Sequence, residues 1–294
     1  RPSVGPTGWV PEYAVTITPI ERKEQDHVIL GLYTPGTPAY GSLIENALDL
    51  TSVAPYGWEL DSYGGLVTNF EPETLGRSLF FAGNQELETY GHVRISVNPT
   101  RLLQSTYLQE NSINRLVGMV EEWGMKGVLI QLNYTPGDEQ PQLYQFLAEL
   151  SASFHTQGLK TLIGLPWNEN IDYLAASKAV DYIVLGHDTN FATPGPLASL
   201  PELEARLQAI SATLDLTKII MAVPTSGIDW ARMGNYEELS HDEVLELAAR
   251  HGATVRWDSE SMSPFFKYGN GHEVWFENRY SLKYKLGLIS QYEL

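Results

Sequence analysis

Two amide side chains, Gln131 and Asn133, stand at the end of a short apolar run in the segment GVLIQLNYTP, residues 127–136. The run opens with three consecutive aliphatic residues, as a buried strand does. Side chains two residues apart on a strand point to the same side, so both amides are expected to face one spot. Amides donate and accept hydrogen bonds but do not release a proton near neutral pH. The pair therefore predicts ligand binding, with core amides satisfied by their neighbours as the alternative.

The elements that would position these amides alternate along the chain as strand and helix. Apolar runs predict strands at residues 27–33, 51–58, 92–99, 127–132, 161–167, 181–186, 218–225 and 272–277. Apolar residues that recur every three or four positions predict helices at residues 112–124, 143–158, 200–215 and 281–294. Strands separated by helices pair in parallel, and eight such units predict an α/β fold of the (β/α)8 TIM barrel type.

Two segments fall outside this alternation. Residues 1–26 contain four prolines and end in a charged run, which predicts an N-terminal linker or arm before a barrel at 27–294. Residues from about 230 to 271 exceed one helix and contain a helical pattern and two polar strand-like runs, which predicts a small α+β insertion between strands seven and eight. Because the chain begins with Arg1 and not with Met, we expect a processed form or an excised fragment.

The composition excludes several classes of function. A net charge of −17 argues against nucleic acid and against a polybasic contact with membrane, because it offers nothing to neutralise phosphates. The absence of cysteine excludes disulfides and thiolate metal sites, and the 7 His residues show no paired metal-binding spacing. No apolar run has the length of a membrane-spanning helix. Neither a metal nor another cofactor is expected.

The carboxyl ends of the strands are where a barrel of this type carries its site. The side chains expected there are rich in aromatic rings and amides, and the predicted ligand-binding group consists of Tyr33, Tyr56, Trp58, Gln131, Asn133, Asp188 and Trp275. Aromatic faces stack on the C–H faces of sugars, and amides pair with sugar hydroxyls, so the group predicts a carbohydrate ligand. Core packing is the alternative for the aromatic residues, and a helix N-cap is the alternative for Asp188.

From about residue 27 to its end, the chain resembles the family 18 glycoside hydrolases, in particular the chitinase-like proteins of bacterial spores and cell envelopes. The segments that carry the resemblance are HVILGLYTPGTPAYGSL at 27–43, KIIMAVPTSGIDW at 218–230, and ATVRWDSESMSPFFKY with HEVWFEN within 253–278. The resemblance implies a barrel with Trp275 on the floor of a sugar subsite. In active members it implies hydrolysis of N-acetylglucosamine polymers, with the substrate's own N-acetyl group as the nucleophile.

The family's catalytic motif, Asp-x-x-Asp-x-Asp-x-Glu, aligns with Lys126, Leu129, Gln131 and Asn133. Asn133 thus stands at the position of the catalytic Glu, and Gln131 at that of the Asp that orients the acetamido group. His187 and Ser226 replace two family tyrosines. Loss of a positioned acid costs roughly 10²–10⁴-fold in rate. Several departures together indicate natural loss of catalysis.

The sequence predicts a family-18-like domain that binds chitin or peptidoglycan without hydrolysis, outside the cell or in the cell envelope, including the spore. One alternative is an active glycosidase that uses a displaced carboxylate, with Asp188, Glu169 and Asp138 as candidates. Another is a structural or protein-binding scaffold whose groove is blocked by bulky side chains such as Leu129, Tyr134 and Phe191. The exact glycan, the oligomeric state and any domain before Arg1 stay open.

Overall fold

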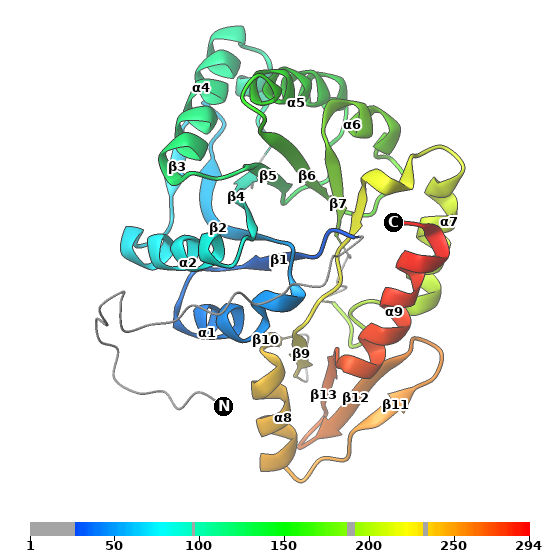
Figure 1. Ribbon diagram of the computed structural model, residues 1–294. Coiled ribbons are helices and arrows are strands. Elements are labelled where there is room, and N and C mark those ends of the chain that lie inside the picture. The colour runs from blue at the N-terminus through cyan, green and yellow to red at the C-terminus, as the bar shows by residue number, and fades with distance from the viewer. Residues whose placement is uncertain (1–26, 96–97, 187–191, 232–234) are drawn as a thin grey trace, which may run out of the picture.

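The main sheet of the molecule is a curled wall of parallel strands. The computed structural model describes residues 27–95, 98–186, 192–231 and 235–294 (Figure 1). The parallel strands, in spatial order, are β1 Leu30–Tyr33, β2 Ser52–Leu60, β4 Glu88–Ile95, β5 Gly127–Leu132, β6 Lys160–Leu165, β7 Tyr182–Leu185 and β8 Ile219–Met221. A short strand, β3 Leu66–Thr68, pairs antiparallel with the end of β2. These strands match the first seven sequence predictions in order.

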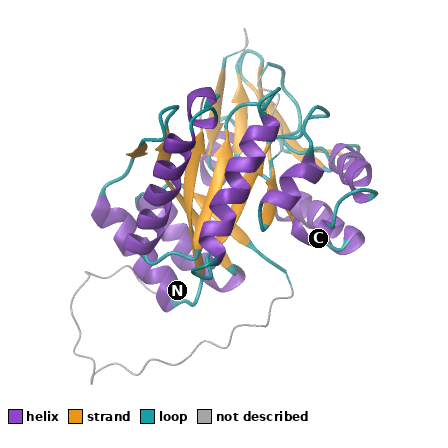
Figure 2. Cartoon of the chain, turned by 90° about the horizontal axis from the view of Figure 1, so that it is seen from above, coloured by secondary structure: helices purple, strands orange, loops and turns teal. Residues whose placement is uncertain are grey.

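Helices cover the outer face of this wall (Figure 2). They are α1 Thr37–Asn46, α2 Pro72–Asn84, α3 Thr100–Leu103, α4 Thr106–Trp123, α5 Gln140–His155, α6 Tyr173–Ala179, α7 Leu200–Ser211 and α9 Arg279–Tyr292, with short 3₁₀ turns η2 Ala47–Asp49 and η3 Leu216–Lys218. Helix α4 begins where the Ser105 side chain accepts a hydrogen bond from the Leu108 N–H and ends at Gly124, in the left-handed region with φ 63°. A curled parallel sheet with helices outside is the arrangement of a (β/α)8 TIM barrel, as predicted.

The strands are buried on both faces, which is why their sequences read as continuous apolar runs. Val93, Ile95 and Val128 face the helices and join the main hydrophobic core. Tyr90 of β4 and Leu129 of β5 lie an odd number of positions from the outward-facing residues of their own strands. They belong to a separate cluster on the inner face with Ala54, Leu162 and Val184. This alternation fixes which side chains can reach the inside of the barrel.

A second, antiparallel sheet is built from the C-terminal third of the chain. Its strands, in spatial order, are β10 Tyr236–Leu239, β9 Gly227–Trp230, β13 His272–Phe276, β12 Ser263–Tyr268 and β11 Arg256–Asp258, and helix α8 His241–Arg250 packs against it. The predicted eighth barrel strand, residues 272–277, is β13, which pairs antiparallel with β12 and β9. The reason is the tight turn before it: Tyr268 pairs with His272, and two of the three residues between them, Gly269 and Gly271, have positive φ.

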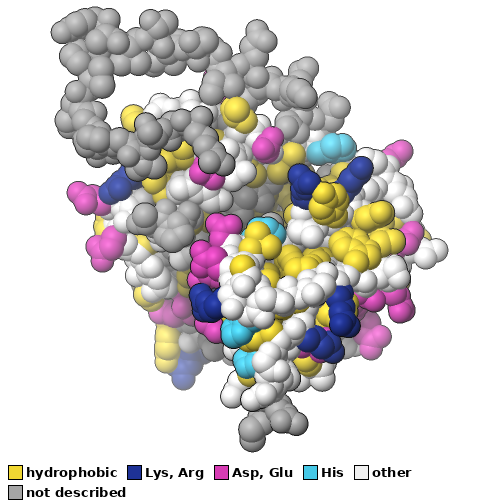
Figure 3. Space-filling view, turned by 90° about the horizontal axis from the view of Figure 1, so that it is seen from below, with side chains coloured by type: hydrophobic (Ala, Val, Ile, Leu, Met, Phe, Trp, Pro, Cys, Tyr) yellow, Lys and Arg dark blue, Asp and Glu magenta, His cyan; other side chains and the backbone are white. Residues whose placement is uncertain are grey.

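A buried ion pair fastens α9 to this second sheet. Lys285 of α9 donates to the Glu277 carboxylate and, at 3.1 Å, to Ser263 Oγ, and both charged side chains are completely buried. Burial raises the pKa of Glu277 and lowers that of Lys285, and the attraction between the two charges opposes both changes. On the surface, hydrophobic side chains gather on the face seen from below, with Lys and Arg beside them (Figure 3). Exposed aromatic side chains of β11 and α9 include Trp257, Tyr280 and Tyr284.

Candidate functional site at the strand ends

A row of four residues crosses the carboxyl ends of neighbouring strands. Glu59 of β2 is the register partner of Arg94 of β4, which is the partner of Gln131 of β5, which is the partner of Gly164 of β6. Arg94 and Gln131 share the inner face with Tyr90 and Leu129 through strand alternation. We call Glu59, Arg94, Gln131 and Gly164 the mouth row. The row places a carboxyl group, a guanidinium and an amide next to one another at the carboxyl ends of the strands, where the sequence predicts the site.

The Arg94 guanidinium lies over the ring of Tyr56. Its Cζ is 3.6 Å from the ring centroid, which is a close cation–π contact. The Tyr56 hydroxyl accepts a hydrogen bond from Asn69 Nδ2 at 3.4 Å, and the ring meets His92 edge-on with centroids 5.6 Å apart. Among the described residues Arg94 has no ion pair within 4.0 Å, although Glu59 is its register partner. The ring contact restrains the guanidinium, whose N–H groups have no hydrogen-bond acceptor among the described residues and could therefore bind one.

His92 lies one layer below Arg94 on the inner face. It is only 6% exposed, and the backbone of Ala54 is close enough to its ring to favour the protonated form slightly. Burial, and to a lesser degree the positive charge of Arg94, lowers its pKa from 6.5 to about 4. His92 is therefore neutral at pH 7 and acts as the floor of the mouth, not as a proton donor.

The two amides that the sequence singled out both lie at this end of the sheet. Gln131 is half-buried, and its Nε2 donates to the carbonyl of Leu132 at 3.2 Å. Its amide occupies the space that a side chain at Gly164 would take, since a Cβ there would lie 2.0 Å from Gln131 Oε1. Asn133 is exposed, and only its backbone N–H is tied down, by the Ile95 carbonyl at 3.0 Å. Exposure contradicts the alternative of a core amide for Asn133.

The structure corrects the placement of Trp58 and Tyr33. A bulge in β2 pairs Tyr56 with His92 but Trp58 with Val93, so one extra residue reverses the face of everything beyond it. Trp58, 2% exposed, consequently packs in the core on the helix side, and its ring meets Phe70 edge-on at 4.9 Å.

Tyr33 also faces the helices. Leu30 belongs to the inner cluster, so Tyr33, three positions on, has the opposite parity, and it packs with Leu43 and Ala82 beside α1 and α2. Tyr33 and Trp58 therefore support the wall and do not line the mouth.

Trp275 lies in β13 of the antiparallel sheet. It is 9% exposed, its ring is stacked on Phe265 with centroids 4.6 Å apart, and its indole N–H donates to Glu273 at 2.8 Å. It forms a small hydrophobic cluster with Ile228 and Trp230. The observed packing corresponds to the core alternative, and a role as a sugar-stacking floor stays a prediction.

Of the displaced acids proposed from the sequence, one lies outside the described residues and two lie in exposed loops. Asp188 lies outside the described residues, as do His187 and Phe191. Asp138 and Glu169 are both exposed in loops. Of the two other bulky side chains expected to block the groove, Leu129 is fully buried on the inner face and Tyr134 packs against the main core.

Three residues of the mouth were missed in the sequence: Glu59, His92 and Arg94. The alternation of His92 and Arg94 with Val93 and Ile95 was a usable signal, because polar residues two apart share one face. Glu59 could not be found in this way. Trp58 and Leu60 on either side of it pack in the main core, so Glu59 faces the side of Arg94 only because the bulge precedes it.

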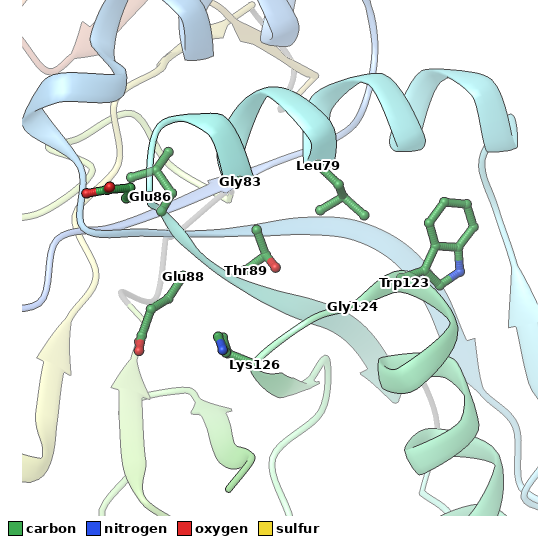
Figure 4. Close-up of a pocket in the computed structure, with 9 residues that line it drawn as sticks. Leu79, Gly83, Glu86, Glu88, Thr89, Trp123, Gly124 and Lys126 are labelled. Atoms are coloured by element: carbon green, nitrogen blue, oxygen red, sulfur yellow. The ribbon is translucent and has the colours of Figure 1, made fainter. Parts of the chain in front are cut away.

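A cavity of about 290 Å³ lies at the opposite end of the strands. It is lined by Leu79, Gly83, Glu86, Leu87, Glu88, Thr89, Trp123, Gly124 and Lys126, beneath the end of α2 (Figure 4). Lys126, at the position of the first Asp of the family motif, precedes β5 and is thus separated from Gln131 by the length of the strand. This end of a barrel supports stability, and we do not assign the site to it.

A polar cluster sits in the antiparallel sheet. Asp229 accepts hydrogen bonds from the Tyr268 hydroxyl at 2.5 Å and from His272 Nδ1 at 3.0 Å. A second cavity of about 290 Å³ adjoins it, at the turn between β12 and β13. Over the ranges that the structure describes, no group of three His, Asp or Glu residues is placed to hold a metal, and no helix is long and apolar enough to cross a membrane.

The curled parallel sheet, with polar side chains at its carboxyl ends, defines a protein of the TIM-barrel class. Residues 99–294 match the family described as Glycosyl hydrolases family 18, and the chain belongs to this family. The resemblance seen in the sequence is thereby confirmed. The chain is 25% identical over 215 residues to the cortical fragment-lytic enzyme of Bacillus subtilis, covering 66% of this chain and 50% of that protein.

Two solved structures have closely similar folds. The chitinase from Chromobacterium violaceum has a TM-score of 0.83 at 24% identity, covering 91% of this chain and 92% of that one. The spore cortex-lytic enzyme SleL of Bacillus megaterium has a TM-score of 0.81 at 21% identity, covering 95% and 71%. The chain spans about half the length of the first curated relatives it matches. It is therefore a family 18 glycosidase-like domain related to spore cortex-lytic enzymes.

Proposed function

We propose that this domain binds a polymer containing N-acetylglucosamine, chitin or peptidoglycan, and does not hydrolyse it. The observation that carries the proposal is the pair of amides, Gln131 half-buried in the mouth row and Asn133 exposed beside it, at the two positions where active relatives need carboxyl groups. An amide can hold a sugar hydroxyl or acetamido group but cannot protonate a leaving oxygen. The relatives named for cortex lysis support an envelope or spore setting and a peptidoglycan partner.

The charge of the mouth supports the same conclusion. Cleavage in this family develops positive charge on the sugar, and carboxylates beside it stabilise that charge. Here the mouth row presents the Arg94 guanidinium next to Glu59, over the ring of Tyr56 and without an ion-pair partner within 4.0 Å in the described residues. A fixed cation raises the energy of a cationic transition state, whereas it does not hinder the binding of a neutral or acidic sugar.

Sedimentation with insoluble chitin and with purified peptidoglycan tests the proposal. We expect the wild-type chain to sediment with at least one polymer and to release no reducing sugar. Asn133→Ala should weaken binding roughly fivefold, the value of about one hydrogen bond. Asn133 is suitable because it is exposed, whereas Trp275→Ala would remove a buried ring and disturb folding.

The matched control is Asn84→Ala. Asn84 is an exposed residue of the same type at the end of α2, near the opposite end of the strands, and its loss should leave binding unchanged. Failure of the wild type to bind either polymer would contradict glycan recognition. Release of sugar would contradict the loss of hydrolysis.

A glycosidase with a displaced carboxylate is the second candidate, and Glu59 is the observation that favours it. Its half-buried carboxyl group belongs to the mouth row, in register with Arg94. Turnover of a fluorogenic chitobioside that disappears in Glu59→Gln but persists in Asp138→Asn would establish this alternative.

A further inference from the structure

The charged group in the mouth points to a narrower class of glycan than the family assignment does. Arg94 offers a planar array of N–H donors whose face is held by Tyr56, at a Cζ-to-centroid distance of 3.6 Å. A guanidinium restrained by a ring contact can bind the two oxygens of a carboxylate bidentately with its N–H groups. Sugar hydroxyls, by contrast, are satisfied by neutral amides such as those of Gln131 and Asn133.

The described neighbours of Arg94 provide no ion-pair partner for it. Below it, His92 is 6% exposed and neutral at pH 7, so the floor adds no second cation. Beside it, Gln131 is an amide and Gly164 has no side chain, so neither neutralises the guanidinium. Glu59 is the remaining member of the mouth row, and it forms no ion pair with Arg94 within 4.0 Å.

The energy of the arrangement favours an anionic ligand. An arginine that is half-buried loses part of its hydration, and a bound carboxylate restores hydrogen bonds to it in a region shielded from bulk water. The chain as a whole carries a charge of −17, so its overall charge does not attract anions. Within the described part of the mouth row, Arg94 is the cationic group that could distinguish an acidic from a neutral sugar of the same size.

We propose that the mouth row selects an N-acetylhexosamine glycan that carries a carboxylate on a ring substituent, with Arg94 as the residue that binds the carboxylate. This inference rests on the proposed glycan-binding function and adds the chemical class of the ligand. Glu59 acts against the ligand in this scheme, because its own carboxylate lies on the neighbouring strand and repels the incoming one.

Calorimetry with two disaccharides tests the proposal: N-acetylglucosaminyl-N-acetylmuramic acid, which carries a lactyl carboxylate, and chitobiose, which has none. We expect wild type to bind the acidic disaccharide roughly tenfold or more tightly, the value of a charge-assisted hydrogen-bond pair. Arg94→Gln should bind both equally, and Arg94→Lys should keep part of the preference. Glu59→Gln should increase the preference, which distinguishes a specific effect from damage to the fold.

Arg279→Gln is the matched control. Arg279 also stacks on a tyrosine, Tyr280, with Cζ 4.7 Å from the centroid, but it does so on the exposed surface of α9. Its loss should leave the preference intact. Equal affinity of wild type for the two disaccharides, or a preference that survives in Arg94→Gln or falls in Glu59→Gln, would overturn the inference while leaving glycan binding in place. Absence of binding to either sugar would overturn both proposals, and release of monosaccharide would contradict only the loss of hydrolysis.

Discussion

At the residue scale, the mouth of this barrel combines two neutral amides with a positive charge. Gln131 and Asn133 are uncharged, and Arg94 lies on the neighbouring strand as the register partner of Gln131. His92 beneath is buried and neutral, with a pKa lowered to about 4 by desolvation first and by Arg94 second. Arg94 and the buried His92 are thus linked electrostatically, because the charge of Arg94 lowers the pKa of His92.

His92 gives the folded protein a measurable pH dependence. Its pKa is lower in the folded chain than the ordinary 6.5 of an unfolded one, so the unfolded chain binds the proton more readily. Stability should therefore fall as the pH drops from about 6.5 towards 4, by up to about 3 kcal/mol. His92→Leu should remove this part of the dependence. Urea unfolding at pH 7 and pH 4.5 measures it, and an unchanged difference in the variant would show that other groups cause the loss.

At the element scale, the bulge in β2 decides which side chains reach the mouth. It turns Trp58 towards the helices and turns Glu59 towards Arg94. Gly57 lies at the bulge, and Phe70 packs so closely against it that a Cβ would lie 2.4 Å from the ring. The bulge, Gly57 and the Trp58–Phe70 contact thus depend on one another.

Gly57→Ala should consequently destabilise the fold by about 1–3 kcal/mol, because the added methyl group overpacks against Phe70. The same substitution at Gly83 should have the opposite sign. Gly83 lies in α2, where an added Cβ would meet no atom within 4 Å, and alanine favours a helix by about 1 kcal/mol over glycine. Thermal and urea unfolding of the two variants compare the effects. A Gly57→Ala variant as stable as the wild type would contradict the role of close packing at the bulge.

At the scale of the whole molecule, the positions that align with the family's catalytic motif are spread over the length of one strand. The motif positions 126, 129, 131 and 133 carry Lys, Leu, Gln and Asn, and they lie along the length of β5 and just beyond each of its ends. The antiparallel sheet is fastened to α9 through the buried Lys285–Glu277 pair. Changing one of these motif positions to an acid therefore leaves the charges at the other positions, and the packing of the antiparallel sheet, unchanged.

Restoring the two carboxyl groups should not restore an enzyme. We expect the double variant Gln131→Asp with Asn133→Glu to release product from a fluorogenic chitobioside at a rate near background. Adding Arg94→Gln should raise that rate by roughly tenfold or more, because it removes the cation that opposes the transition state. Adding Arg279→Gln to the double variant is the control and should change nothing. High activity of the double variant alone would show that Arg94 does not oppose catalysis.

The sequence by itself determined the parts that follow from local pattern. Apolar runs and helical periodicity located seven parallel strands and the main helices, and the spacing of Gln131 and Asn133 placed both amides at the strand ends, because period and parity are properties of neighbouring residues. Tertiary structure alone decided the rest. The bulge exchanged Trp58 for Glu59 at the mouth, and the tight turn before β13 assigned residues 272–276 to the antiparallel sheet. The bulge depends on pairing between β2 and β4, and the place of β13 depends on pairing with β12 and β9, which the pattern of no single strand specifies.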